Sequence, residues 1–89
     1  MSWEARYSTM AQDDLAELPV STQRRIVKKI GSLLSADDPM RFAKPLAGDF
    51  SAYFRFRIGD YRVIFSRRHD GTLQILNVIR IGHRRDVYR

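Results

Sequence analysis

Apolar and polar residues alternate along residues 53–58, and this stretch has the clearest pattern in the chain. The alternating positions are Phe54, Arg55, Phe56, Arg57 and Ile58. Successive side chains of a β-strand point to opposite faces, so the alternation predicts a strand with one buried and one solvent-exposed face. The Gly59-Asp60 pair that follows is typical of a two-residue hairpin turn, because glycine adopts positive φ without steric cost. We therefore predict a β-hairpin over residues 53–65.

A two-residue turn sets Arg57 directly opposite Arg62 on the neighbouring strand. The apolar face of the hairpin is then formed by Phe54, Phe56, Ile58, Tyr61, Val63 and Phe65. The other face carries Tyr53, Arg55, Arg57, Arg62 and Ile64. Like charges directly opposite each other destabilise a sheet, so we expect an anionic ligand or partner to neutralise this face. Tyr61 is expected in the core, and Arg57 is the arginine that is hardest to explain by structure alone.

Residues 3–7 also alternate and predict a short first strand. A helix follows, since Thr9 and Gln12 have the spacing of a capping box, with Thr9 at the N-cap. Pro19 is expected to end this helix. Its first turn would hold Asp13 and Asp14.

A second, longer helix is predicted over residues 23–34, with Ser21 or Thr22 as its N-cap. Its buried stripe consists of Ile26, Val27, Ile30, Leu33 and Leu34. Its outward face carries Arg24, Arg25, Lys28 and Lys29. We interpret these four cations first as a solvated helix face and second as a nucleic-acid contact. Two helices joined so closely predict an antiparallel hairpin that packs on a sheet.

The last long apolar run, residues 73–81, is apolar at both odd and even positions. This predicts a central strand covered on both sides, beside the first strand. Its register stays open, because a one-residue change in the preceding loop would swap its faces and move Arg80 from one side to the other. Residues 41–51 are expected to be irregular and residues 82–89 to form a polar, basic tail. The resulting fold is α+β with the order β-α-α-β-β-β, a mostly antiparallel sheet with an N-terminal helical hairpin packed on one face and the other face left open.

Length and charge narrow the class of protein. The 89 residues suffice for a single domain over residues 1–89, and the apolar fraction of 44% is that of a globular protein. The net charge of +6 is unevenly placed, because residues 41–89 hold eleven Lys/Arg against four Asp/Glu, and ten of the eleven are arginine. Arginine binds phosphate bidentately and stacks on bases, so this half of the chain points to RNA, DNA, a membrane surface or an acidic protein partner.

Several classes of site are poorly supported. Without cysteine there is neither a disulfide framework nor a thiolate metal site. His69 and His83 lie in different loops with no carboxylate pair at ligand spacing, and the glycines form no phosphate-binding loop. We therefore expect no metal and no cofactor. The start of the chain does not resemble a signal peptide, and no run is long enough to span a bilayer, so a soluble cytoplasmic domain is expected.

The arginine cluster does fit one reaction, cleavage of RNA by its own 2′-hydroxyl. The hydroxyl must lose its proton, the pentavalent phosphorane must be stabilised, and the leaving 5′-oxygen must be protonated. Arginine supplies the second requirement by preorganised charge, and a tyrosine or histidine can transfer protons. The candidates are Tyr53, Arg55, Arg57 and Arg62, joined by His83, Arg84 and Tyr88 if the tail folds back. The same cluster would also suit simple binding of phosphates or of an acidic peptide.

Three stretches resemble the RelE branch of the RelE/ParE toxin superfamily. They are Lys44-Pro45-Leu46-Ala47-Gly48, Gly59-Asp60-Tyr61-Arg62-Val63-Ile64-Phe65 and Val78-Ile79-Arg80-Ile81-Gly82-His83-Arg84-Arg85-Asp86-Val87-Tyr88. The resemblance covers the whole chain and implies a toxin of a type II toxin–antitoxin pair. Toxins of this branch enter the ribosomal A site and cut mRNA there without a metal, leaving a 2′,3′-cyclic phosphate and a 5′-hydroxyl. A cognate antitoxin wraps the toxin and neutralises it.

The resemblance also implies roles for individual residues. Arg55 and Arg57 match basic residues that surround the scissile phosphate, and Arg62 matches the arginine that stabilises the phosphorane. Arg84 matches an arginine near the phosphate and the leaving oxygen. Tyr88 matches the tyrosine that helps to activate the 2′-hydroxyl and stacks on a base. Further RNA contacts are expected from Lys44, Tyr53, His83 and Arg85.

The chain departs from the family pattern at several of these positions. Tyr53 and Arg55 occupy a stretch in which other members often carry lysines, and arginine is a poor proton donor or acceptor. His83 stands where other members have a lysine and can itself exchange protons. Arg85 could substitute for Arg84 if the tail shifts by one residue.

Two other functions stay open. A ParE-like toxin shares the fold but inhibits DNA gyrase and is not a nuclease. That branch generally lacks the full arginine and tyrosine set, so the presence of Arg62, Arg84 and Tyr88 favours the RelE branch. The other is an inactive relative that only binds its antitoxin.

The expected partners follow from these functions. They are a cognate antitoxin, which would form a toxin–antitoxin hetero-oligomer, together with the ribosome and mRNA, and no membrane. An exposed sheet edge and an apolar groove along the helical hairpin are the places where a disordered partner can add a strand or a helix.

Overall fold

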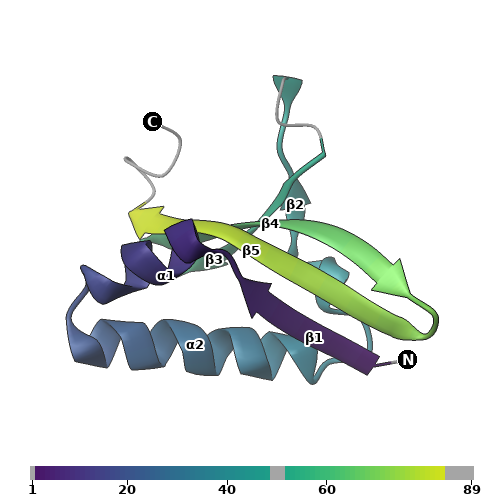
Figure 1. Cartoon of the computed structure of the whole chain (residues 1–89), viewed down its shortest axis with the longest axis horizontal. Helices are drawn as coiled ribbons and strands as arrows, with labels where there is room; N and C mark the ends of the chain where they lie inside the picture. Colours follow the sequence, from purple (N-terminus) through teal and green to yellow (C-terminus); the bar gives the residue numbers. More distant parts are fainter. Residues whose placement is uncertain (1, 49–51, 84–89) are drawn as a thin grey trace.

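Five strands and two α-helices form the part of the chain that the computed structural model describes, residues 2–48 and 52–83. In chain order the elements are β1 (Ser2–Tyr7), α1 (Thr9–Ala16), α2 (Val20–Leu34), a 3₁₀ turn η1 (Pro39–Phe42), β2 (Lys44–Pro45), β3 (Phe54–Ile58), β4 (Tyr61–Asp70) and β5 (Leu73–His83). The strands form one sheet in the order β1-β5-β4-β3-β2, with β1 parallel to β5 and the other neighbours antiparallel. Figure 1 shows α2 along one side of the sheet and α1 beside β5. The α+β fold with its helical hairpin is confirmed, and β2 is one strand more than the sequence predicted.

The core lies between α2 and the side of the sheet that faces it. Ile26, Ile30 and Leu33 of α2 recur at helical spacing and are buried there. The sheet contributes Phe56, Ile58, Val63, Phe65, Leu76, Val78 and Ile81. Each fully buried side chain of this size contributes about 1.5–3 kcal/mol, so this seam holds the helical layer on the sheet. Tyr7 packs against the same core, and burial raises the pKa of its phenol above the ordinary value of 10.0.

The β3–β4 hairpin has the predicted register. Arg57 lies opposite Arg62, Ile58 lies opposite Tyr61, and Gly59 in the turn has a φ of +58°. The six residues predicted on the apolar face, Tyr61 included, all belong to the core or pack against it. The arginines of the hairpin therefore lie on the face opposite the helices.

A β-bulge in β5 explains why this strand is apolar at both odd and even positions. The register with β4 shifts after Ile64, which pairs with Arg80, so Ile79 is an extra residue on β5. The extra residue shifts the alternation by one, and Val78 and Ile81 both face the core although they are three positions apart. β5 is central and lies beside β1, as predicted. The bulge also resolves the open register and puts Arg80 beside Ile64, on the face opposite the core and α2, where its side chain still reaches α1 at the sheet edge.

The first helix begins one residue earlier than the sequence predicted. Ser8 is the N-cap, not Thr9, because the Ser8 Oγ accepts a hydrogen bond from the Ala11 amide at 3.0 Å. The same hydroxyl donates to the Ile79 carbonyl of β5 at 3.0 Å, a tertiary contact that favours Ser8 over its neighbour. The Gln12 side-chain amide donates to the Tyr7 carbonyl at 3.0 Å, whereas in a capping box this side chain would accept from the amide of the N-cap residue. The carboxylates that consequently fall beyond the first turn are Asp13 and Asp14.

The boundary between the helices also differs from the prediction. The first helix ends at Ala16, and Pro19 stands at the N-cap position of α2 instead of closing α1. Neither Ser21 nor Thr22 caps α2, since both lie inside it. The φ of −54° at Pro19 is the value that its ring imposes, and it suits entry into a helix.

The segment predicted as irregular contains regular structure in its described part. Asp38 precedes η1 and accepts a hydrogen bond from the Met40 amide at 3.1 Å, which fixes the start of the turn. Two residues further on, Lys44 pairs with Arg55 and extends the sheet beyond β3. This short edge strand matters for the site because it adds a cation to the open face.

Candidate functional site

Two neighbouring rows of residues cross the sheet on the face opposite the helices. One row consists of Lys44 on β2, Arg55 on β3, Ile64 on β4 and Arg80 on β5. The next row consists of Arg57 on β3, Arg62 on β4 and Gly82 on β5. Directly opposed residues share a face and lie about 4.5–5.5 Å apart, so the cations of both rows form a single patch. We call this patch the cationic face and define it by Lys44, Arg55, Arg57, Arg62 and Arg80.

Carboxylates of the described residues neutralise only part of the cationic face. Arg80 forms an ion pair with Asp14, whereas Arg55 and Arg57 contact no carboxylate within residues 2–48 and 52–83. Arg57 is exposed, and its directly opposed neighbour is Arg62, an arrangement that costs stability. An anion with several charges would relieve this repulsion, and the planar fork of arginine fits the oxygens of a phosphate. The patch is therefore suited to a phosphodiester chain.

The structure brings most of the residues predicted on the sheet together. Lys44 lies directly opposite Arg55 and is exposed. Tyr53 is half-buried and immediately precedes β3, where its carbonyl accepts a hydrogen bond from the Leu46 amide at 3.0 Å. That bond ties the segment after β2 to the start of β3. Tyr53 thus borders the row that begins at Lys44.

His83 lies on the other side of the sheet from the cationic face. It pairs with Tyr61, and the two rings meet edge to face with their centroids 6.1 Å apart. The remaining predicted site residues, Arg84, Arg85 and Tyr88, lie outside the described residues. Their roles stay predictions.

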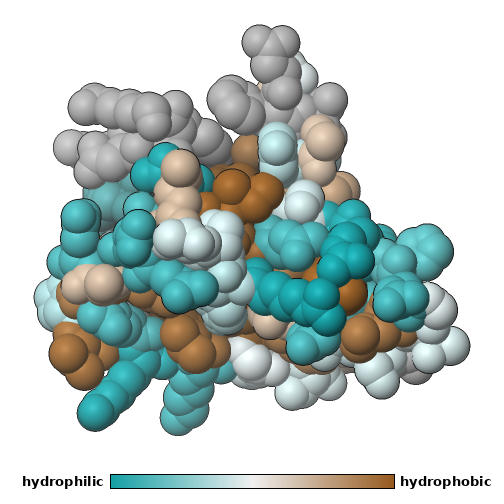
Figure 2. All heavy atoms as spheres, viewed as in Figure 1, coloured by the Kyte–Doolittle hydropathy of each residue, from teal (hydrophilic) through white to brown (hydrophobic). Residues whose placement is uncertain are grey.

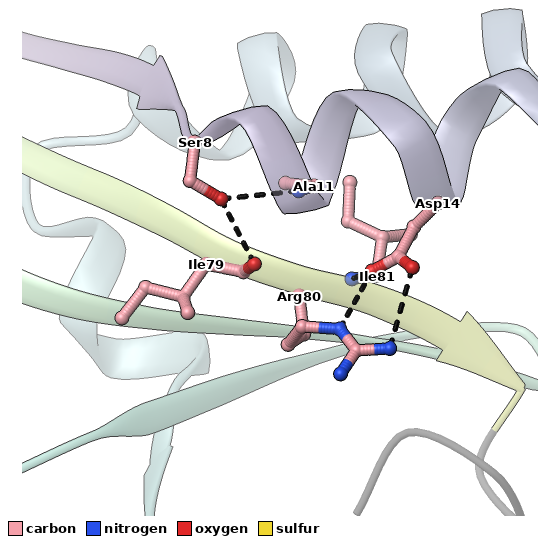
Figure 3. A network of polar contacts seen from close by, with 6 residues as sticks. All are labelled: Ser8, Ala11, Asp14, Ile79, Arg80 and Ile81. Carbon is pink, nitrogen blue, oxygen red and sulfur yellow. Dashed lines mark hydrogen bonds and ion pairs between the residues drawn. The ribbon is translucent and has the colours of Figure 1, made fainter.

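Asp14 is a site residue that the sequence analysis missed. Figure 3 shows its carboxylate on α1 reaching the guanidinium of Arg80 on β5. Oδ2 accepts from Arg80 Nε at 3.0 Å and Oδ1 accepts from Arg80 Nη2 at 3.4 Å. Oδ2 also accepts from the backbone amide of Ile81 at 2.9 Å, so one carboxylate fixes both the strand and its side chain. In the sequence Asp14 had only the signal of a residue near a helix start.

An open cleft of 320 Å³ lies next to Arg80, between α1 and the ends of β4 and β5. Its lining residues are Asp14, Glu17, Leu18, Tyr61, Arg80, Ile81, Gly82 and His83. The cleft combines an aromatic pair, two carboxylates and one guanidinium. It therefore offers both stacking surfaces and charged groups at the border of the cationic face.

The helical hairpin carries a different surface. A groove of 450 Å³ is lined by Leu15, Gln23, Arg24, Val27 and Lys28. Val27, which was predicted in the buried stripe of α2, is 45% exposed on this groove. All four cations predicted on the outward face of α2 are exposed, as expected for a solvated face. Figure 2 shows hydrophilic and hydrophobic side chains side by side along α2, at the bottom of the view.

Residues 2–48 and 52–83 contain no group of three or more His, Asp or Glu side chains that could hold a metal ion. Neither α1 nor α2 has the length and apolar content to cross a membrane.

Known proteins match the chain over nearly its whole length. The family model for the ParE toxin of type II toxin–antitoxin systems, parDE, matches residues 5–88. Toxin RelG of Mycobacterium tuberculosis is 33% identical over 89 residues, 100% of this chain and 99% of that toxin. In the RelBE2 toxin–antitoxin complex from Mycobacterium tuberculosis, the matching chain is 28% identical with a TM-score of 0.77, over 94% of this chain and 100% of that one. The YoeB/ParE toxin from Agrobacterium tumefaciens is 25% identical with a TM-score of 0.64, over 93% of this chain and 98% of that one.

Proposed function

The chain belongs to the ParE toxin family of type II toxin–antitoxin systems, within the RelE/ParE superfamily, and we propose that it is a ribosome-dependent mRNA endonuclease. It cuts the message in the ribosomal A site by metal-independent attack of a 2′-hydroxyl, and so inhibits translation. The RelE-like sequence motifs support this branch of the superfamily. Translating ribosomes are cytoplasmic, and we propose the same location for the chain.

The observation that carries the proposal is the cationic face. Arg62 lies on β4 between Arg57 of β3 and Gly82 of β5, and it is half-buried in the sheet. A guanidinium at this position can stabilise the charge that develops on the phosphorane, with little reorganisation if it is preorganised there. Arg55 and Lys44 extend the same patch and suit the phosphates on either side of the scissile one.

The proposed reaction balances as a transesterification. The 2′-oxygen loses its proton to a base and attacks the adjacent phosphorus, and the bond from phosphorus to the 5′-oxygen breaks. The 5′-oxygen takes up a proton, so the products are a 2′,3′-cyclic phosphate and a 5′-hydroxyl. Arg62 stabilises the phosphorane, with Arg55 and Arg57 around it. By resemblance, Arg84 lies near the phosphate and the leaving oxygen, and Tyr88 helps to activate the 2′-hydroxyl. The residues assigned to RNA binding are Lys44, Tyr53, His83 and Arg85.

Primer extension on an mRNA under translation tests the proposal. The wild-type chain should produce cuts within A-site codons, and Arg62→Ala should slow cleavage by about 10²–10³-fold, the usual cost of losing one charge-stabilising group. Tyr88→Phe should also slow it. Arg68→Ala is the matched control, because Arg68 is exposed on the same strand but six residues away, roughly 20 Å along β4. Full activity of Arg62→Ala, or equal loss in Arg68→Ala, would reject this site.

A second candidate function is inhibition of DNA gyrase. The description of the matching family model as ParE toxin favours it. Intact mRNA together with arrested growth would call for a supercoiling assay, in which inhibition of gyrase would support this candidate. An inactive antitoxin-binding relative would give neither result.

We propose a cognate antitoxin as the partner, in a toxin–antitoxin hetero-oligomer. The similar RelBE2 chain is part of a toxin–antitoxin complex. Two surfaces offer places for such a partner: the groove on the helical hairpin, at Leu15 and Val27, and the free edge of β2 at the end of the sheet. An acidic segment of the partner would neutralise the cationic face. No step of this function needs a membrane.

A further inference from the structure

The Asp14–Arg80 pair is more constrained than a surface ion pair. The Asp14 side chain is only 16% exposed and that of Arg80 35%, and two hydrogen bonds join them. The third bond of the carboxylate, from the Ile81 amide, anchors it to β5 itself. Exposed pairs contribute little to stability because their side chains stay mobile. Here the guanidinium is held in one orientation by a carboxylate that is itself fixed.

Among residues 2–48 and 52–83, the side-chain acceptor that bonds this guanidinium is Asp14, and this orientation leaves one edge of the guanidinium toward other ligands. Arginine has five N–H donors, and Asp14 accepts one from Nε and one from Nη2. The remaining three donors belong to Nη1 and Nη2, and in Figure 3 the unbonded nitrogen points away from Asp14. Such a two-nitrogen fork matches a pair of phosphate oxygens.

Arg80 is also well placed relative to the proposed reaction centre. It pairs with Ile64, two residues from Arg62 on the same face of β4. Diagonal neighbours of this kind lie about 7–8 Å apart, within reach of two long side chains. The 320 Å³ cleft beside Arg80 leaves room for the sugar and base attached to a phosphate at this point.

We propose that Arg80 binds an RNA phosphate next to the scissile one, and that Asp14 is the positioning residue that aims it. The inference rests on the proposed function, since RNA is the ligand in both. The nucleotide attached to this phosphate occupies the cleft, where Tyr61 and His83 offer aromatic surfaces for its base.

Because Asp14 is negatively charged, its positioning role can be tested by the direction in which its removal changes the affinity for RNA. A carboxylate close to bound RNA repels its phosphates, so removal of a carboxylate without a positioning role strengthens RNA binding. A positioning carboxylate has the opposite effect, because its loss frees the guanidinium to move. Glu17 provides the matched control, since it lines the same cleft from the same side and forms no ion pair among the described residues.

The experiment measures binding of a 2′-O-methyl RNA oligonucleotide, which cannot be cleaved, by fluorescence anisotropy at several salt concentrations. Arg80→Ala should weaken binding by about tenfold and lower the salt slope by about 0.7, the value for one phosphate contact on a single strand. Asp14→Asn should weaken binding severalfold, although it raises the net charge, whereas Glu17→Gln should leave it unchanged or stronger. In the Arg80→Ala background, Asp14→Asn should cause no further loss.

Two controls separate positioning from folding. Thermal midpoints identify any variant that has lost its structure. Arg80→Lys keeps the charge and the Ile81 bond of Asp14 but lacks the fork, and should bind with intermediate affinity.

Stronger binding in Asp14→Asn, or a wild-type chain that does not bind the oligonucleotide, would overturn the inference. The assay involves no cleavage. If the binding changes are as expected but no mRNA cuts are found, the endonuclease function would be refuted. The phosphate site at Arg80 would still be supported.

Discussion

Ser8 joins a helix to a strand through a single hydroxyl. Its Oγ accepts from the Ala11 amide and donates to the Ile79 carbonyl, both at 3.0 Å, and its own amide donates to the Val78 carbonyl at 2.9 Å. β1 ends just before it, opposite Val78. Ser8 and then Asp14 thus continue the hydrogen bonding along the edge of β5 where β1 stops. This edge holds the bulge that orients Arg80.

Ser8→Ala should lower the free energy of unfolding by about 1–2 kcal/mol, because the helix loses its cap and a β5 carbonyl loses a donor. Urea denaturation of the two proteins at neutral pH measures the difference. Thr9→Ala is the control, and its cost should stay below about 0.5 kcal/mol, as is usual for a surface position. A larger cost at Thr9 than at Ser8 would assign the cap to the residue that the sequence favoured.

At this scale the sequence predicted the residues whose position depends on local alternation. Arg55, Arg57 and Arg62 share a face because a two-residue turn allows one register only. The Asp14–Arg80 pair could not be predicted from the sequence, because the two residues are 66 positions apart and meet only where a bulge has shifted the register of β5. Arg84 and Tyr88 depend on the resemblance alone.

The helices and strands differ in how well the hydrophobic pattern of the sequence predicted them. The β3–β4 hairpin was predictable because its turn is short and its two faces differ sharply. β5 was not, because a bulge adds a residue without leaving a sequence signal in an all-apolar run. The helix boundaries shifted by a few residues because Ser8 and Thr9 are both competent caps, and tertiary contacts with β5 decided between them.

Two glycines should respond to alanine with opposite sign. Gly59 in the hairpin turn has a φ of +58°, so Gly59→Ala should cost about 1–2 kcal/mol of stability through left-handed strain. Gly31 lies within α2, and a Cβ there would meet no atom within 4 Å. Gly31→Ala should therefore stabilise the protein by about 0.5–1 kcal/mol, because it lowers the entropy of the unfolded chain.

Urea midpoints of both variants, at equal slope, check this pair of predictions. Each variant is the other's control, since both add one methyl group at a glycine. A stabilising Gly59→Ala would contradict the turn conformation and, with it, the register that sets Arg57 opposite Arg62.

At the scale of the whole molecule, the sheet separates two tasks. One face packs on α2 and forms the core, whereas the other carries the five cations of the cationic face. Among residues 2–48 and 52–83, Asp14 is the one carboxylate that forms an ion pair with a member of the cationic face. We therefore expect the cationic face to lower the stability of the isolated chain, and a bound ligand or partner with negative charge to offset that cost.

Arg57→Gln tests this trade between stability and function. Removal of one member of the opposed Arg57–Arg62 pair should raise the free energy of unfolding by about 0.2–1 kcal/mol at low salt. The gain should shrink in 1 M salt, where the Debye length falls from about 10 Å at 0.1 M to about 3 Å. Arg68→Gln is the control, because Arg68 faces Ile75 on β5 and should change little. The same Arg57→Gln protein should cleave mRNA more slowly than the wild type. If the Arg57→Gln variant is less stable than the wild type and fully active, Arg57 has a structural role. It would then not contribute to the function proposed for the cationic face.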